Sequence, residues 1–144
     1  MKCVLVGTDG SDGAARAVDY AARWAKGSEA RLLIVNVTAG SLPDKMFSRL
    51  TNAEQAWLKE LHTSISAQTV KDAREHARRI DASAIELESR TGDPAQTIID
   101  IAEKKDMDAI VVGKRGAGRV VGLLVGSVSQ KIVSLAQRPV IVVP

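Results

Sequence analysis

Residues 109–129 of the chain read AIVVGKRGAGRVVGLLVGSVS. The apolar residues 109–112 end at Gly113, as expected for a short strand that is buried on both faces of a sheet. Five glycines fall within the fourteen positions from Gly113 to Gly126, and an apolar helical pattern follows them. The stretch therefore predicts a buried strand, a glycine-rich loop and a helix that begins at the last glycine.

The rest of the chain repeats this alternation of short apolar runs and helical patterns. Strands are predicted at residues 4–6, 32–37, 85–88, 109–112 and 140–143. Helices are predicted at about residues 13–26, 52–79, 94–105 and 128–136, and a loop at 38–50. Strands that alternate with helices predict a single α/β domain, residues 1–144, with a mainly parallel sheet.

Two local features add detail to the predicted helices. Gly27 is expected to end the first helix, after an N-cap at Ser11 or Asp12. In the long second helix, an approximate helical stripe includes Trp57, and we expect this side chain to anchor the packing. Leu61 and Ile65 belong to the same stripe.

Composition limits the class of protein. The chain has 144 residues, 45% hydrophobic and 26% charged, which suits one ordinary domain. Since no apolar run approaches the ~18 residues of a membrane helix, we expect no membrane partner. The lone Cys3 is expected to be buried, and one cysteine fits a cytoplasmic location. A net charge of +3 with few aromatic residues argues against nucleic acid as a partner.

Ligands of open α/β sheets bind beyond the carboxyl ends of the strands, where the strand order reverses. Two segments of unusual composition follow strands: residues 7–11, GTDGS, and the glycine-rich loop. The amides of residues 126–129 begin a helix and suit phosphate oxygens. Lys114, Arg115 and Arg119 add positive charge. The chemistry favours a phosphate site, and the alternative is a solvent loop with an ordinary glycine start to a helix.

The spacing Gly113-x2-Gly116-x9-Gly126-Ser127 resembles the G-x2-G-x9-G-[S/T] pattern of the ATP-binding branch of the universal stress protein family. The resemblance covers the whole chain, since residues 8–11 and 138–143 also match. It implies an open five-stranded parallel sheet of order 3-2-1-4-5 with helices on both faces, and a homodimer. It also implies a stress-response or regulatory protein that binds an adenine nucleotide, ATP, ADP or AMP, between strands one and four.

By position, the resemblance implies which residues bind the nucleotide. The adenosine end is expected to contact Gly7, Thr8, Asp9 and Val37. The ribose and first phosphate are expected to contact Val112 and Gly113. The phosphates are expected to contact amides and hydroxyls of Gly116, Gly126, Ser127, Val128 and Ser129. Family members often carry a bulkier residue or a proline in place of Gly7, and Asp9 is alternatively a turn residue only.

The sequence contains no evident catalytic group. His62 and His76 lie in the long polar helix, so neither is expected to act as a base for Ser127 or Ser129. No cluster has metal-ligand spacing, although Mg²⁺ can accompany a triphosphate because it binds largely through phosphates and water. We expect a binding protein, and the alternative is a slow ATPase or a self-phosphorylating protein with one of these serines as acceptor.

The apolar run 140–143, VIVV, is predicted to form the homodimer. In the implied strand order it is an edge strand, and exposed apolar edges invite pairing with a second chain. A two-fold axis beside the run would pair it antiparallel with its copy. The alternative is that the run is interior. A regulatory protein partner is also expected, without a residue pattern that identifies it.

Overall fold

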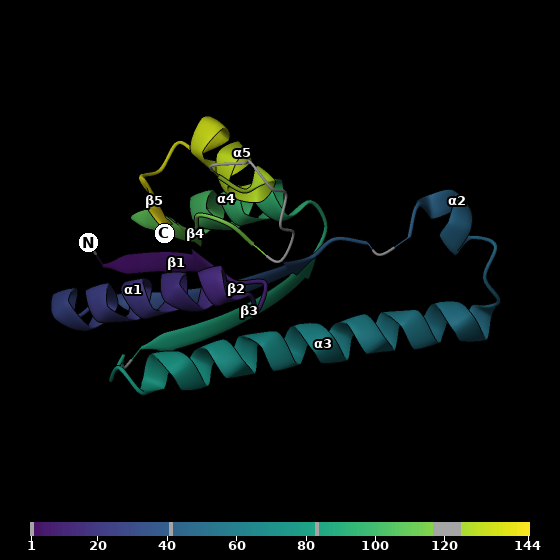
Figure 1. The fold of residues 1–144 in the computed structure, drawn as a ribbon, viewed down its shortest axis with the longest axis horizontal. Helices are drawn as coiled ribbons and strands as arrows, with labels where there is room; N and C mark the ends of the chain where they lie inside the picture. The colour runs from purple at the N-terminus through teal and green to yellow at the C-terminus, as the bar shows by residue number, and fades with distance from the viewer. Residues whose placement is uncertain (1, 41, 83, 117–124) are drawn as a thin grey trace.

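The computed structural model describes residues 2–40, 42–82, 84–116 and 125–144 (Figure 1). Its centre is a five-stranded sheet in the order β3-β2-β1-β4-β5. The strands are β1 (Cys3–Gly7), β2 (Arg31–Thr38), β3 (Ile85–Thr91), β4 (Ala109–Gly113) and β5 (Val140–Val143). Every neighbouring pair is parallel, and Val6 of β1 lies between Ile34 of β2 and Val111 of β4. The predicted parallel sheet and its order are confirmed.

Helices cover both faces of this sheet (Figure 1). The helices are α1 (Asp12–Ser28), α2 (Asp44–Phe47), α3 (Asn52–Arg78), α4 (Pro94–Lys104) and α5 (Ser127–Leu135). One core lies between the sheet and α1 with the second half of α3, and the other lies beneath α4 and α5. Within the described ranges, no helix is both long and apolar enough to cross a bilayer.

The strands β1 and β4 are apolar along their length because both of their faces are covered. Val4 and Val6 of β1 point into the core beneath α1, whereas Cys3 and Leu5 point into the core beneath α4. Cys3 is a free, buried thiol, as predicted. Along β1 and β4, polar side chains therefore begin only beyond the strand ends.

The predicted start of the first helix is confirmed and its predicted end is wrong. Ser11 is the N-cap, and its hydroxyl accepts a hydrogen bond from the amide of Ala14 at 3.2 Å. The helix continues past Gly27 to Ser28, and Glu29 then adopts the left-handed conformation with φ 53°. The amide of Glu29 bonds to last-turn carbonyls, so this capping bond, and not the glycine, determines where the helix ends. The short helix α2 lies where only a loop was predicted.

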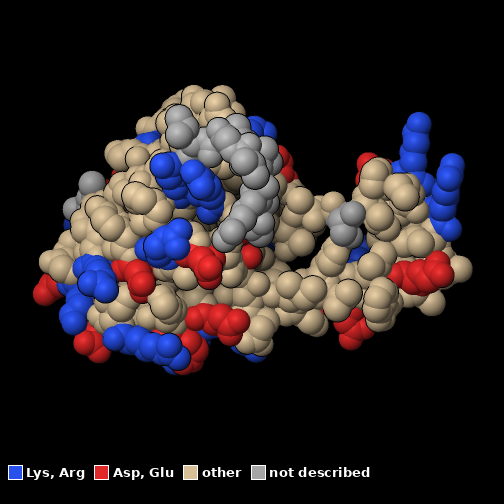
Figure 2. Space-filling view, viewed as in Figure 1, with Lys and Arg blue, Asp and Glu red and all other residues tan. Residues whose placement is uncertain are grey.

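The first half of α3 does not contact the sheet, and the expectation that Trp57 anchors the core is wrong. Trp57, Leu61 and Ile65 are 61%, 39% and 56% exposed. A helix of 27 residues is about 40 Å long, whereas a strand of eight residues spans about 26 Å. The excess length of α3 therefore extends past the sheet together with α2 (Figure 2).

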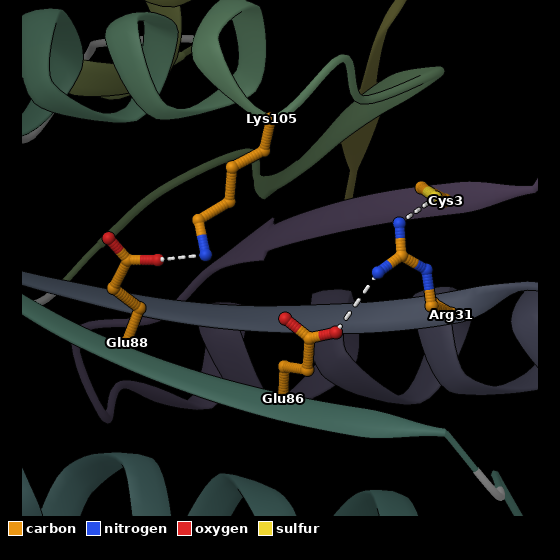
Figure 3. Close-up of polar contacts among 5 residues, drawn as sticks. All are labelled: Cys3, Arg31, Glu86, Glu88 and Lys105. Atoms are coloured by element: carbon orange, nitrogen blue, oxygen red, sulfur yellow. Dashed lines mark hydrogen bonds and ion pairs between the residues drawn. The ribbon is translucent and has the colours of Figure 1, made fainter.

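Charged pairs cover part of the β3 edge of the sheet (Figure 3). Arg31 donates to Glu86 at 3.2 Å and, through its other terminal nitrogen, to the sulfur of Cys3 at 3.0 Å. Glu88 of the same strand forms an ion pair with Lys105, with 2.9 Å between the Oε2 and Nζ atoms. The hydrogen bond from Arg31 to Cys3 is the main cause that raises the pKa of Arg31. These contacts account for the alternation of apolar and acidic residues in this strand.

A pair of substitutions in α3 tests where its packing begins. Trp57→Ala is expected to change the free energy of unfolding by no more than about 0.5 kcal/mol, because the side chain is exposed. Val70→Ala removes a much smaller side chain that is 5% exposed, and is expected to destabilise by about 2 kcal/mol. Urea unfolding measures both. A larger loss for Trp57→Ala than for Val70→Ala would place Trp57 in the core.

Candidate functional site

A cavity of about 290 Å³ opens at the carboxyl ends of β1 and β4. The structure brings to this one cavity all eleven residues that the sequence predicted for nucleotide binding. They are Gly7, Thr8, Asp9, Val37, Val112, Gly113, Gly116, Gly126, Ser127, Val128 and Ser129. The location follows from the topology, because β1 has β2 on one side and β4 on the other, so the crossovers leave in opposite directions.

A close approach of two backbones lies beside the cavity. A Cβ atom on Gly113 at the end of β4 would lie only 2.7 Å from the carbonyl oxygen of Gly13 in α1. A Cβ atom on Gly13 would in turn overlap the carbonyl oxygen of Arg115. Only glycine allows this contact, which brings the loop after β4 against the first turn of α1.

A second close approach joins the loops that follow β1 and β4. One carboxylate oxygen of Asp9 accepts the amide of Ser11 at 2.9 Å. The other oxygen lies 2.5 Å from the point where a Cβ atom on Gly116 would stand. Asp9 is thus a turn residue that also presents its carboxylate at the cavity.

The first turn of α5 supplies the donors of the site. The amide of Gly126 donates to the carbonyl of Lys114 at 2.7 Å, and the first helical bond runs from Gln130 to Gly126. The amides of Ser127, Val128 and Ser129 precede that bond, and such first-turn amides have no carbonyl partner inside a helix. Residues 127–129 all line the cavity, at the positive end of the helix dipole.

The hydroxyl of Ser129 has a structural role. It donates to the carbonyl oxygen of Gly113 at 2.6 Å and so holds α5 against the end of β4. Its one hydrogen is engaged in this bond. The amide of Ser129 is left as its donor to a ligand.

Five lining residues were not among those predicted: Ala14, Ala39, Pro94, Ile98 and Arg115. Pro94 and Ile98 lie one turn apart at the start of α4, and the helix begins directly after β3. Since parallel strands end at one edge of the sheet, this helix start was a usable signal. Arg115 was noted only as nearby charge, and Arg119 lies outside the described residues.

An ion pair joins α4 to α5 beside the cavity. Asp93 caps α4 by accepting the amide of Gln96 at 2.9 Å, and it also accepts the ammonium of Lys131 on α5 at 2.9 Å. The backbone amide of Gln96 is the main cause that lowers the pKa of Asp93, and Lys131 adds to it. The two helices that frame the cavity are thus tied to each other.

The described part of the cavity lining includes neither histidine. The Nε2 atom of His76 lies 2.6 Å from a carboxylate oxygen of Asp19, and this pair joins α3 to α1. Among the residues that the structure describes, no group of three or more His, Cys, Asp or Glu side chains is placed to hold a metal ion. The cavity combines an apolar pocket with a set of backbone amide donors, and this combination suits the binding of a ligand.

The sequence is similar to one family along its full length. The model of the universal stress protein family matches residues 1–144. Universal stress protein Rv1636 of Mycobacterium tuberculosis is 32% identical over 142 residues, which cover 99% of this chain and 95% of the relative.

Solved structures of universal stress proteins are also similar to this chain along its full length. UspA from Lactobacillus plantarum superposes with a TM-score of 0.84 at 28% identity, covering 99% of this chain and 97% of that one. A universal stress protein crystallised in complex with cAMP superposes with a TM-score of 0.71 at 27% identity, covering 99% and 96% of the two chains.

The charge of Asp93 is expected to contribute to stability in a pH-dependent way. Its pKa is lowered in the folded protein, so its contribution is present above the ordinary pKa of a carboxyl and is lost as pH falls through the lowered value. Asp93→Ala is expected to be less stable than the wild type at pH 7, and the difference is expected to shrink at about pH 3. Urea unfolding at both values measures this.

Asp93→Asn is the matched variant, because asparagine retains the N-cap and loses only the charge. Its stability at pH 7 is expected to lie between those of the wild type and Asp93→Ala. A difference between Asp93→Ala and the wild type that stays constant with pH would contradict the assignment.

Proposed function

Because this chain belongs to the universal stress protein family, we propose that it binds an adenine nucleotide in the cavity between β1 and β4. The observation that carries the proposal is the convergence of an apolar pocket and a helix N-terminus on this cavity. The relative that was crystallised with cAMP supports the same ligand class. In this role the chain is a stress-response or regulatory protein that responds to the nucleotide it holds.

The apolar part of the cavity suits the adenine ring. Val37 at the end of β2, Val112 at the end of β4 and Ile98 of α4 line it. The flat faces of an adenine ring placed among these side chains bury apolar surface. The carboxylate of Asp9 lies in the same lining and suits the hydroxyls of a ribose or the amino group of the base.

The opposite part of the cavity suits phosphate. The first-turn amides of α5 and the positive end of its dipole favour an anion, and the side chain of Arg115 adds a charge. Since the described residues form no metal cluster, Mg²⁺ that accompanies ATP is expected to bind through phosphate oxygens and water. ATP, ADP and AMP all carry the groups that this arrangement recognises.

Substitution of Gly126 tests the phosphate end. A Cβ atom here would lie 3.4 Å from the Cα atom of Arg115, an ordinary contact, so Gly126→Ala is expected to fold and to bind nucleotide. The branched side chain of Gly126→Val needs more room, and it is expected to press on the loop after β4. We expect the affinity for ATP to fall by at least about tenfold.

Calorimetry with ATP on both variants measures the difference, and circular dichroism confirms that each is folded. Equal affinity for ATP in folded Gly126→Val and Gly126→Ala proteins would remove the first turn of α5 from the site. A wild-type protein that binds no adenine nucleotide would overturn the proposed function itself.

We also propose that two copies pair through β5, which is the last strand of the sheet. Ile110 donates to the carbonyl of Pro139, and Lys114 to that of Val143. Because such bonds alternate along a parallel pair, the amides and carbonyls of Val140 and Val142 point to the open edge. The side chains of β5 pack against the cores on both faces, so the edge presents backbone groups to a second chain.

Two proline substitutions distinguish the open edge from the paired edge. Val142→Pro removes an outward amide and is expected to give a folded monomer, because edge strands tolerate proline on the solvent side. Ile141→Pro removes an amide that points to β4 and is expected to destabilise the fold. Light scattering and urea unfolding measure the two effects. A dimer that survives Val142→Pro, or a wild-type monomer at micromolar concentration, would contradict pairing through β5.

A further inference from the structure

Asn36 is a buried polar residue that interrupts the apolar run of β2. It lies near the end of β2, after the run 32–35, and its exposed fraction is 7%. A buried amide side chain is costly unless its hydrogen bonds are made. Its partners therefore show what this residue does in the fold.

The side chain of Asn36 connects a helix to the loop of the cavity. Its nitrogen donates to the carbonyl oxygen of Thr8 at 2.8 Å. Its oxygen accepts the hydroxyl of Ser66, a buried residue of α3, at 2.6 Å, and the hydroxyl of Thr38 lies 3.4 Å from the same oxygen. Because the hydroxyls bind the oxygen, the amide is held with its nitrogen toward Thr8.

The carbonyl of Thr8 belongs to the turn that presents the adenosine end of the cavity. The amide of Thr8 continues the ladder by donating to Val35 at 2.8 Å, and its hydroxyl accepts the amide of Gly10 at 3.2 Å. Gly10 has a positive φ of 80°, and a Cβ atom built on it would lie 3.6 Å from the methyl group of Thr69. Ser66 and Thr69 lie on one face of α3, and Ser66 supports the turn through Asn36.

We propose that Asn36, oriented by Ser66, is a positioning residue that holds the turn at Thr8, Asp9 and Gly10 in the geometry that binds the adenosine part of the ligand. The inference rests on the proposed function, because it assigns a role within the same site. It assigns to α3, which contributes no residue to the described cavity lining, control over the affinity of the cavity.

The predicted consequence is specific to one end of the ligand. Ser66→Ala leaves the amide of Asn36 free to rotate, and its oxygen then faces the carbonyl oxygen of Thr8 part of the time. Two acceptors repel, so the carbonyl of Thr8 loses its hydrogen bond to Asn36 for that part of the time. The affinities for AMP and for ATP are expected to fall by the same factor, about three- to tenfold, because the two ligands share the adenosine end.

The matched control is Thr63→Ala, which removes another hydroxyl of α3. Thr63 donates to the carbonyl of Lys59 at 2.9 Å within the exposed part of the helix. This variant is expected to bind AMP and ATP as the wild type does. Calorimetry gives the affinities, and urea unfolding confirms that both variants are folded under the conditions of binding.

A second variant gives a signature that a purely structural role would not produce. Asn36→Asp keeps the shape of the side chain, and its ionised carboxylate cannot donate to the carbonyl of Thr8. When the pH is lowered, the buried carboxyl takes up a proton and can donate again. The ratio of wild-type to variant affinity for AMP is therefore expected to be large at pH 8 and to fall as the pH is lowered toward 5.

The outcomes distinguish a failure of the proposed function from a failure of the inference about Asn36. Wild-type protein that binds neither AMP nor ATP overturns the proposed function and this inference together. Wild-type binding with unchanged affinity in folded Ser66→Ala protein overturns the inference alone. A loss confined to ATP, or a loss in Asn36→Asp that does not vary with pH, also overturns it, because either result places the effect away from the hydrogen bond to Thr8.

Discussion

The burial of β1 on both faces is the constraint on which the rest of this structure depends. Val4, Leu5 and Val6 are at most 1% exposed, and they send side chains alternately into the two cores. A strand in this position tolerates no polar side chain, so polar residues begin at Thr8, beyond the strand end. With β2 and β4 on either side, the strand order also reverses here, and the cavity opens at this point.

The site is formed mainly by backbone. Gly113 and Gly13 bring β4 and α1 into direct contact, and Gly116 leaves room for the carboxylate of Asp9. The hydroxyl of Ser129 then fixes α5 to the end of β4, so that the first-turn amides of α5 are directed at the cavity. Preorganised amides of this kind bind an anion with little rearrangement, and this agrees with the nucleotide-binding character of the family member crystallised with cAMP.

The helix α3 differs from the others because its two halves have different surroundings. The second half is packed through Val70, Ala73 and Ala77. The first half exposes an apolar row that includes Trp57. This half of the helix extends past the sheet (Figure 1). Ser66 lies where these halves meet, and its hydrogen bond to Asn36 connects the junction to the cavity loop. A single helix therefore joins an exposed surface to the cavity loop through two buried polar side chains, Ser66 and Asn36.

The sequence by itself determined the parallel α/β sheet and the end of the sheet at which two segments of unusual composition lie. The eleven residues that the structure gathers around one cavity were implied by the family resemblance. The secondary structure of runs such as 32–35 and of the glycine-spaced segment from Gly113 to Gly126 depends on residues that are close in sequence. It can therefore be predicted from the sequence alone. The order of the strands came with the family resemblance and is borne out by the sheet. Only the tertiary structure decided that Trp57 is exposed, because that depends on the length of α3 relative to the sheet. It also decided that Asn36 meets Ser66, because residues 30 positions apart become partners only when a helix packs on a strand at one register.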